Sequence, residues 1–264
     1  MRLRDETAAR SWRLESFEEL GSTNDEAMER GRAGDPGGLW IVAARQSAGR
    51  GRLGRVWSSP PGNLFASLLL VDPAPPDRAP QLGFVAGVAL IEALREVAGA
   101  GDRVALKWPN DALFDGGKLA GILLEASQLP GGAFACVVGV GVNCASHPAG
   151  LPYPASDLSE FGARASRENL FPAFADCFAR WFDKWSGGDG FPLVREAWLA
   201  SAAGLGAQIE VARGDGRLKG LFRTIDSRGR LVLDADAGET VIEAGDIFLS
   251  VGPRVESRRP EDQT

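Results

Sequence analysis

The spacing of apolar residues changes near residue 205, and this change limits the folds open to the 264-residue chain. Before that point short apolar runs alternate with stretches in which apolar residues recur every three or four positions, which predicts an α+β domain. From Gln208 onward the helical spacing disappears, and five short apolar runs alternate with glycine-containing turns. Five short strands in so few residues predict a small barrel-like β-domain. We therefore expect one domain over residues 1–204, a second over 205–252, and a charged, disordered tail over 253–264.

Three helices are predicted in the first domain. The first begins at Thr23, which we expect to be the N-cap, with Glu26 in capping-box spacing. The second runs from Leu82 to Val97, because apolar residues recur at helical spacing up to Gly99 and Gly101. The third begins near Asn169, with Pro172 in its first turn.

Ten strands are predicted from short apolar runs bounded by turn residues. In the first domain they cover residues 39–44, 64–70, 104–106, 121–125 and 135–142. In the second domain they cover residues 208–212, 218–225, 231–233, 240–243 and 247–250.

The charge balance excludes several classes of partner. The chain has 29 basic and 35 acidic residues and a net charge of −6, so it repels nucleic acid and anionic membranes. No apolar run approaches the roughly 20 residues that span a bilayer, and the charged N-terminus has no signal-peptide core. We expect a cytoplasmic protein with no nucleic-acid or membrane partner.

The cysteines and the single histidine argue against disulfide frameworks and zinc sites. Cys136, Cys144 and Cys177 are odd in number and form no Cys-x-x-Cys pair, so neither a disulfide framework nor a thiolate zinc site is indicated. The single histidine, His147, lies in a polar stretch that predicts a solvated loop, and one imidazole cannot build a typical zinc centre. Any chemistry must depend on lysines, arginines, carboxylates, hydroxyls and backbone dipoles.

The densest functional motif runs from Gly49 to Trp57, with three glycines and three arginines in its first seven residues. Glycine lets a backbone approach a ligand closely, and arginine binds oxyanions through two parallel hydrogen bonds. The letters also match the dinucleotide fingerprint, but Ser58 to Pro61 cannot begin the helix which that motif requires. The phosphate-binding P-loop pattern fails as well, because no Gly-Lys-Ser/Thr follows. A solvated basic loop is the alternative interpretation.

Two further motifs follow. Lys107-Trp108-Pro109-Asn110-Asp111 ends a strand in a fixed turn, which either presents Asn110 and Asp111 for catalysis or serves as a structural Asx turn. Lys118 at the mouth of the next apolar strand is either a surface charge or a point charge aimed at a carboxylate or phosphate. The alternating glycines of Val138 to Asn143 leave one strand face bare, against which a planar ligand or another backbone segment could lie.

Together these motifs resemble the biotin protein ligases, in the same order along the chain. The resemblance extends from Leu14 to Val251 and includes Ser22-Thr23-Asn24 at the first helix start. It implies a mixed β-sheet with helices packed on one face, the catalytic fold shared by biotin ligases and class II aminoacyl-tRNA synthetases, followed by an SH3-like β-barrel. With only about 20 residues before Ser22, we expect the short form without an N-terminal DNA-binding domain.

The activity implied by this resemblance is an ATP-dependent biotin–[biotin carboxyl-carrier protein] ligation. Biotin would be activated as biotinyl-5'-AMP and transferred to a lysine of a biotin carboxyl carrier domain of acetyl-CoA carboxylase or a related carboxylase. Biotin and ATP would be substrates, with Mg²⁺ required and no tightly bound prosthetic group.

The resemblance also assigns roles to individual residues. Those implied to bind biotin are Ser22, Thr23, Asn24, Gln46, Gly49, Arg50, Gly51, Arg52, Lys118 and Gly121. Those implied to bind the nucleotide are Arg52, Arg55, Trp57, Asn110 and Asn143. Those implied to act in catalysis are Lys107, Asp111, Arg52 and Lys118. Asp111 would act through Mg²⁺ or on the proton of the incoming lysine.

Three alternatives stay open at this point. A lipoate or octanoate protein ligase or transferase of related fold would not be expected to carry both the arginine-glycine loop and the Lys107 to Asp111 turn. A biotin-responsive DNA-binding repressor is disfavoured by the acidic chain and the short segment before Ser22. A ligand-binding module without catalysis is disfavoured because every expected basic residue is present.

Overall fold

The computed structural model describes residues 1–4, 7, 10–213, 216–243 and 245–249. The predicted tail over 253–264 and the turn residues 214–215 lie outside these ranges.

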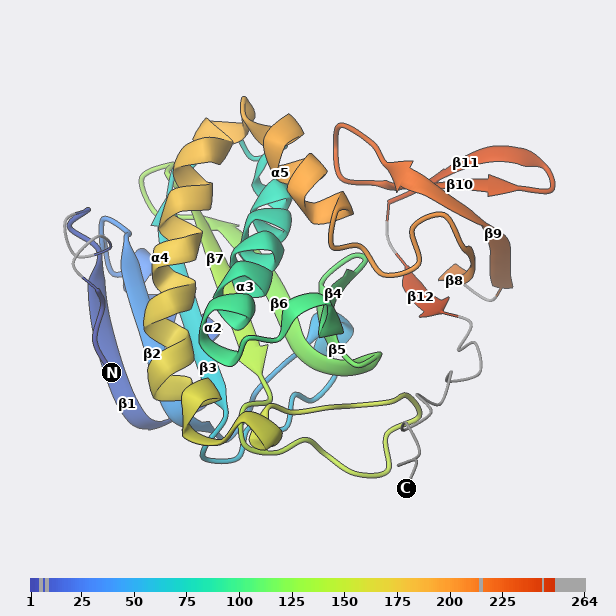
Figure 1. Ribbon diagram of the computed structural model, residues 1–264. Coiled ribbons are helices and arrows are strands. Elements are labelled where there is room, and N and C mark those ends of the chain that lie inside the picture. The colour runs from blue at the N-terminus through green and yellow to red at the C-terminus, as the bar shows by residue number, and fades with distance from the viewer. Residues whose placement is uncertain (5–6, 8–9, 214–215, 244, 250–264) are drawn as a thin grey trace, which may run out of the picture.

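A seven-stranded mixed sheet forms the centre of the first part of the molecule (Figure 1), in the order β1-β2-β3-β7-β6-β5-β4. Strands β1 and β2 are parallel, and every other neighbouring pair is antiparallel. The strands are β1 (Arg13–Leu20), β2 (Leu39–Gln46), β3 (Leu64–Val71), β4 (Val104–Lys107), β5 (Asp111–Phe114), β6 (Gly117–Gln128) and β7 (Phe134–Val142). The sequence did not predict β1 and β5, and it predicted only the middle of β6.

In the described part of the chain, the helices that accompany this sheet include α2 (Thr23–Arg32), α3 (Leu82–Ala98), α4 (Arg167–Trp185) and α5 (Phe191–Leu199). Short 3₁₀ turns lie at Arg52–Gly54, Ala79–Gln81, Gly101–Arg103, Ser159–Ala165 and Ser186–Gly188. The N-cap of α2 is Ser22 rather than the predicted Thr23, because the Ser22 hydroxyl accepts from the Asp25 N–H at 3.4 Å. Helix α3 ends as predicted at Gly99, whose φ of 63° is the left-handed conformation that glycine tolerates. Helix α5 was not predicted.

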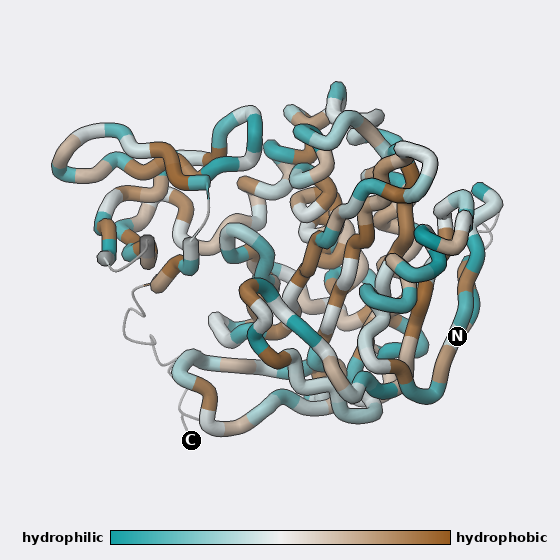
Figure 2. Tube along the Cα trace, turned by 180° about the vertical axis from the view of Figure 1, so that it is seen from behind, coloured by the Kyte–Doolittle hydropathy of each residue, from teal (hydrophilic) through white to brown (hydrophobic). Residues whose placement is uncertain are grey.

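The helices cover both faces of the sheet, which corrects the expectation that they pack on one face. Helices α3 and α4 lie on one side (Figure 1), where Trp40 of β2 contacts the rings of Phe171, Phe174 and Phe178. Helix α2 lies on the opposite face, where it packs with residues that alternate with the first set along β2 and β3. The residues of this second cluster are Ala27, Met28, Leu39, Ile41, Leu69, Leu129, Ala135 and Val137. Both faces of the central strands are therefore apolar, and Figure 2 shows hydrophobic residues along the strands of this sheet.

A five-stranded antiparallel sheet forms the C-terminal part, in the order β11-β10-β9-β8-β12. Its strands are β8 (Gln208–Arg213), β9 (Gly216–Ile225), β10 (Leu231–Ala235), β11 (Gly238–Ile242) and β12 (Asp246–Leu249). Within the described residues the end strands β11 and β12 do not pair, so no closed barrel is formed there; the five short antiparallel strands agree with the small SH3-like β-domain that we expected.

The two sheets are joined through buried and half-buried contacts. The Trp108 indole donates to the Gly229 carbonyl at 3.0 Å, and Arg195 of α5 donates to the Thr224 hydroxyl at 2.7 Å. Gly229, with φ of 81°, lies so close to Phe84 that a Cβ there would stand 2.5 Å from the ring. These contacts hold the C-terminal sheet beside β4 and α5 (Figure 1).

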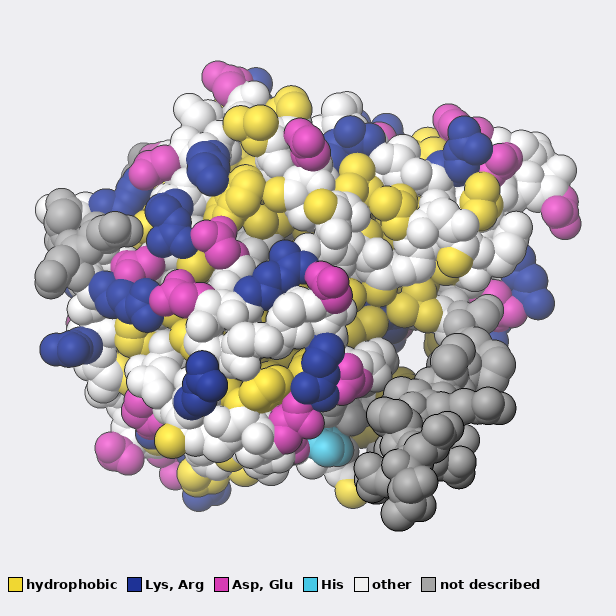
Figure 3. Space-filling view, in the orientation of Figure 1, with side chains coloured by type: hydrophobic (Ala, Val, Ile, Leu, Met, Phe, Trp, Pro, Cys, Tyr) yellow, Lys and Arg dark blue, Asp and Glu magenta, His cyan; other side chains and the backbone are white. Residues whose placement is uncertain are grey.

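The structure shows how the charged side chains and the three cysteines are placed. Basic and acidic side chains are interspersed over the face shown in Figure 3, rather than gathered by sign. In the part of the chain that the structure describes, no helix is long and apolar enough to cross a membrane. All three cysteines are free and buried; burial raises the pKa of the Cys136 and Cys144 thiols to about 12 and that of Cys177 to about 11. His147 lies in an exposed loop and contacts Asp157 at 2.7 Å.

Candidate active site

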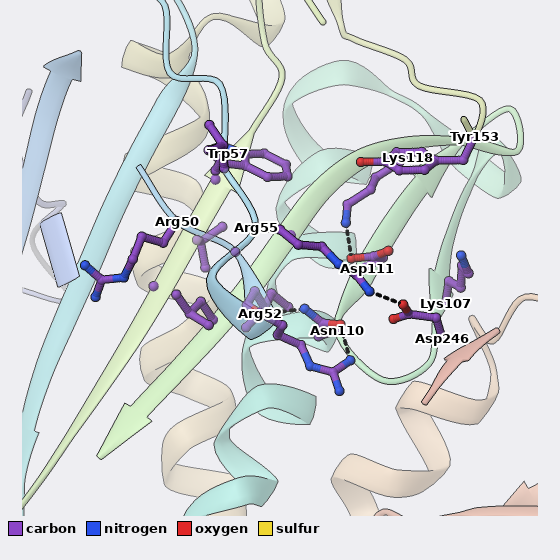
Figure 4. A pocket seen from close by; sticks show the side chains of 18 of the residues that line it. Arg50, Arg52, Arg55, Trp57, Lys107, Asn110, Asp111, Lys118, Tyr153 and Asp246 are labelled. Atoms are coloured by element: carbon purple, nitrogen blue, oxygen red, sulfur yellow. Dashed lines mark hydrogen bonds and ion pairs between the residues drawn. The ribbon is translucent and has the colours of Figure 1, made fainter. Parts of the chain in front are cut away.

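A cavity of about 530 Å³ lies between the first sheet and the C-terminal sheet. Its walls come from the start of α2, the loop of residues 49–57 (the Gly-Arg loop), strands β5 to β7 and strand β12 (Figure 4). Most residues predicted to form the site line it: Ser22, Thr23, Asn24, Gln46, Arg50, Gly51, Arg52, Arg55, Trp57, Lys107, Asn110, Asp111, Lys118 and Gly121. The fold thus brings together motifs that lie more than 90 residues apart in the sequence.

One end of the cavity carries a connected set of polar groups at the start of α2. The Thr23 N–H and hydroxyl both donate to Gln46 Oε1, at 2.8 and 3.1 Å. The Ser67 hydroxyl lies 2.7 Å from Thr23 Oγ1 and 2.6 Å from Asn24 Oδ1, and Asn24 Nδ2 donates to Glu125 at 2.7 Å. Because these side chains fix one another, their donors and acceptors face the cavity in set directions.

The bare glycine face predicted for β7 is present, and side chains of the same chain lie on it. A Cβ on Gly141 would stand 2.5 Å from Trp57 Nε1, and one on Gly139 would stand 2.1 Å from Asn24 Oδ1. Gly121 of β6 faces the same indole, with a distance of 3.2 Å from an added Cβ to the ring. The Trp57 N–H is buried against this strand without a hydrogen-bond partner among the described residues. The glycines therefore give this wall a flat surface that a larger residue would block.

The other end of the cavity is cationic. Lys118 Nζ lies 2.7 Å from Asp111 Oδ1, and it also faces the rings of Trp57 and Tyr153, at 5.6 and 5.8 Å from their centroids (Figure 4). Burial is the main cause that lowers the pKa of Lys107; neighbouring Lys118 adds to the effect and Asp111 opposes it. Two lysines close to one carboxylate leave an excess of positive charge for an anionic ligand.

Two arginines of the Gly-Arg loop border this end. Arg52 donates to Asn110 Oδ1 at 3.2 Å, while the Asn110 amide donates to the Ile122 carbonyl at 2.8 Å. Arg55 donates to Asp246 of β12 at 2.5 Å, which ties the loop to the C-terminal sheet. Burial opposes ionisation of Asp246, but the hydrogen bond from Arg55 and the nearby cations outweigh it and lower the pKa of this carboxyl.

The third arginine of the loop points elsewhere. The guanidinium of Arg50 contacts Asp25 at 2.7 Å and Glu125 at 2.9 Å, on the side of the loop away from Lys118 and Asp111 (Figure 4). Its hydrogen bond to Asp25, with further contributions from Glu125, raises the pKa of Arg50.

Two predicted site residues lie outside the cavity lining. Gly49 sits at the base of the loop, where a Cβ would stand 2.5 Å from Ser59 Oγ and 2.7 Å from the Trp57 carbonyl. Asn143 is buried and donates to the Ser156 carbonyl at 3.1 Å, so its amide holds the segment that carries Tyr153 instead of facing the cavity.

Several lining residues were not predicted. They are apolar side chains of β5 to β7, the segment Pro152 to Pro154, and four consecutive residues of β12: Leu113, Ile122, Leu123, Val140, Pro152, Tyr153, Pro154, Asp246, Ile247, Phe248 and Leu249. Tyr153 could have been predicted as a site residue from the sequence, because an aromatic residue between two prolines is held on a stiff loop.

This arrangement can hold a flat, polar molecule at one end and anionic groups at the other. No cluster of three or more His, Cys, Asp or Glu side chains that could hold a metal ion occurs over the described ranges. The reacting end offers four cations, Lys107, Lys118, Arg52 and Arg55, against the two carboxylates of Asp111 and Asp246. This set is suited to bringing two anions together and stabilising the charge that develops.

Comparison with known proteins points to one family. Residues 20–143 match the family described as biotin/lipoate A/B protein ligase, and residues 204–250 match the biotin protein ligase C-terminal domain. The chain is 42% identical over 237 residues to the biotin–[acetyl-CoA-carboxylase] ligase of Paracoccus denitrificans, covering 86% of this chain and 97% of that protein. It is 33% identical to the corresponding ligase of Mycobacterium tuberculosis, with 93% of each chain covered.

Solved structures agree. The fold matches a biotin protein ligase from Aquifex aeolicus in complex with biotin and ATP with a TM-score of 0.76 and 27% identity, over 89% of this chain and 97% of that one. From the near-complete coverage of the Paracoccus ligase and the matched order of domains, we conclude that the chain belongs to the biotin protein ligase family.

Proposed function

We propose that this protein is an ATP-dependent ligase that activates biotin as biotinyl-5'-AMP and transfers the biotinyl group to a lysine of a biotin carboxyl carrier domain. The observation that carries the proposal is a single cavity with fixed polar groups and a flat glycine face at one end and Lys107, Lys118 and Arg52 at the other. The kinship with ligases named for acetyl-CoA carboxylase supports this carboxylase as the source of the acceptor domain.

In the first half-reaction, the biotin carboxylate attacks the α-phosphorus of ATP and pyrophosphate leaves. Ser22, Thr23, Asn24 and Gln46 hold the polar ring of biotin, and its apolar part lies along Gly121 and the strand side chains. Lys118 and Arg52 draw the carboxylate and the α-phosphate together, because two anions approach only where cations offset their repulsion. Lys107 adds charge at the same point.

The nucleotide lies toward the C-terminal sheet in this proposal. Arg55 meets its phosphates, and Trp57 and Tyr153 supply ring faces. Asn110 holds Arg52 in place, whereas Asn143 acts on the adenine pocket through the Tyr153 segment.

Mg²⁺ would be supplied with ATP, where it would offset the charge of the phosphates. Magnesium in such sites is bound by one or two carboxylates together with substrate phosphates and water. Asp111 is a carboxylate at the cationic end of the cavity and fits this role once phosphates engage Lys118.

In the second half-reaction, the acceptor lysine attacks the acyl carbon of the mixed anhydride, and AMP leaves. The amine must be neutral to react, so a base has to orient or accept its proton. Asp111 is the carboxylate placed for this step. The adenylate hydrolyses if water reaches it, and the Gly-Arg loop is the segment that covers it.

We further propose a cytoplasmic setting, a catalytic part over residues 1–204 and a C-terminal β-domain over 205–252, divided between α5 and β8. In this division, the β-domain contributes the β12 residues of the cavity lining, and Asp246 is the charged one among them.

The test is the intact mass of a carrier domain after incubation with the protein, ATP and Mg²⁺, with biotin, lipoate and octanoate in separate reactions. We expect the mass of the carrier domain to rise by one biotinyl group in the reaction with biotin only. We expect no rise when ATP is left out. A gain with lipoate or octanoate instead would move the protein to the lipoyl branch of the matched family. AMP and pyrophosphate formed without any mass gain would keep the first half-reaction and reject the acceptor.

A further inference from the structure

The Gly-Arg loop has a fixed shape but needs contacts outside itself to fix its position. Gly51 N–H donates to the Arg55 carbonyl at 2.7 Å and Trp57 N–H to the Gly49 carbonyl at 2.9 Å, which makes a small hairpin. Its tip is open to solvent, with Leu53 85% and Val56 89% exposed. Where the hairpin lies over the cavity therefore depends on its side-chain contacts with neighbouring elements.

Arg50 makes the most highly charged of these contacts. Its partners are Asp25, in the first turn of α2, and Glu125, toward the end of β6. The Arg50 and Glu125 side chains are about a third exposed and that of Asp25 about half, so water screens these ion pairs only in part. One guanidinium thus joins the loop, a helix start and a strand.

The charge around Arg50 separates it from Arg52. Arg52 donates to the neutral amide of Asn110, so its charge stays available to an anion. The charge of Arg50 is already balanced by two carboxylates, which would repel a phosphate or carboxylate brought to the same place. Arg50 is therefore suited to holding the loop, and Arg52 to binding the ligand.

Glu125 also connects the loop to the polar end of the cavity. Its second oxygen accepts from Asn24 Nδ2 at 2.7 Å, and Asn24 lies over the backbone of Gly139. The same carboxylate therefore contacts a side chain of the biotin end and the arginine of the loop.

We propose that Asp25 and Glu125 are positioning residues that hold the Gly-Arg loop over the cavity through Arg50 and thereby slow the escape of the adenylate between the two half-reactions. We call the contacts of Arg50 with Asp25 and Glu125 the latch, and its role rests on the proposed function. Slow escape is important because the adenylate must stay bound until the acceptor protein arrives, and each opening of the loop exposes the anhydride to water.

The test measures release of biotinyl-AMP made from radiolabelled biotin, after dilution into excess unlabelled biotin, for Asp25→Asn, Glu125→Gln and the double variant. We expect release to be faster by about two- to fivefold for each change and about tenfold for both, the range for partly exposed ion pairs. Glu125→Gln keeps an amide oxygen that can accept from Asn24. Asp25→Glu keeps a carboxylate for Arg50, so its release of biotinyl-AMP should be as slow as in the wild type. Added salt should accelerate release from the wild type more than from the double variant, because salt screens the ion pairs.

Glu19→Gln is the matched control, because Glu19 lies 3.7 Å from Arg45 on the neighbouring strands outside the loop. Release from the double variant at the wild-type rate would overturn the latch, and so would equal acceleration in the control. A second readout does not need the adenylate: trypsin should cut after Arg52 and Arg55 faster in the double variant than in the wild type. If the wild type makes no adenylate, the proposed function fails, while the trypsin comparison still decides the latch.

Discussion

Lys107 is a half-buried cation whose charge depends on pH more than that of an ordinary lysine. Burial lowers its pKa, and a lysine is charged below its pKa, so rising pH removes this charge earlier than it would in solution. We predict that the rate of adenylate formation falls on the alkaline side as Lys107 loses its proton. Lys107→Arg should abolish that fall, because a guanidinium stays charged, and Lys107→Gln should slow the step about 100-fold at neutral pH.

The measurement is the rate of biotinyl-AMP formation in single-turnover experiments over a range of pH. An alkaline fall that persists unchanged in Lys107→Arg would assign the titration to another group.

Gly141 is the residue where added volume should act most directly on the site. A Cβ there would stand 2.5 Å from Trp57 Nε1, so Gly141→Ala must displace the indole. Overpacking of this kind lowers folding stability by about 1–3 kcal/mol. The displaced indole also changes the wall beside Gly121, along which biotin lies in our proposal, so we predict biotin binding weaker by about tenfold. Titration calorimetry with biotin measures the effect.

Gly83→Ala on α3 is the matched control, since its Cβ would meet only the Leu124 side chain at 3.3 Å. Biotin binding at wild-type strength in Gly141→Ala would mean that the flat face is not part of the biotin site.

At the scale of elements, α4 stabilises the sheet through its aromatic face. Phe178 is fully buried and contacts the rings of Trp12, Trp40 and Phe182. We predict that Phe178→Ala lowers the free energy of unfolding by about 3–5 kcal/mol. Leu193→Ala on α5, where the side chain is mostly exposed, should change it by about 0.5 kcal/mol or less. Urea unfolding of both variants, followed by circular dichroism, measures the difference.

The sequence predicted the helices and strands whose burial gives their apolar residues a regular spacing, and it missed those without such a spacing. Helix α3 and strands β3 and β7 are buried along most of their length and were found nearly to the residue. Strand β1 is an edge strand with apolar residues at Leu14, Phe17 and Leu20, a spacing of three that does not read as a strand. Helix α2 carries so few apolar residues that nothing in its period says which face of the sheet it covers.

The site was predicted in the same uneven way. Lys107 and Lys118 belong to compact motifs, and the sheet brings them together as expected. Asp246 follows Arg55 by 191 residues and belongs to no motif, so only the packing of one sheet against the other could reveal it. Asn143 sits in a motif, yet its amide is used within the fold, which spacing alone cannot distinguish from a ligand contact.

At the scale of the whole molecule, the contact between Arg55 and Asp246 links the loop to the C-terminal sheet. We predict that Asp246→Asn raises the KM for ATP about two- to fivefold, the range for a partly exposed ion pair, and leaves biotin affinity unchanged. Pyrophosphate release at varied ATP measures this. Glu239→Gln, exposed on β11 of the same sheet, is the control. An equal change in both variants would indicate a general effect of charge on the sheet.

The burial of all three thiols also makes the molecule convenient for labelling. Because each cysteine lies in the core with a pKa raised to about 11 or 12, a maleimide at neutral pH finds no reactive native thiolate. Leu53→Cys would therefore place one dye at the exposed tip of the hairpin without removal of any natural cysteine. A fluorophore there would let opening and closing be timed on single molecules during turnover.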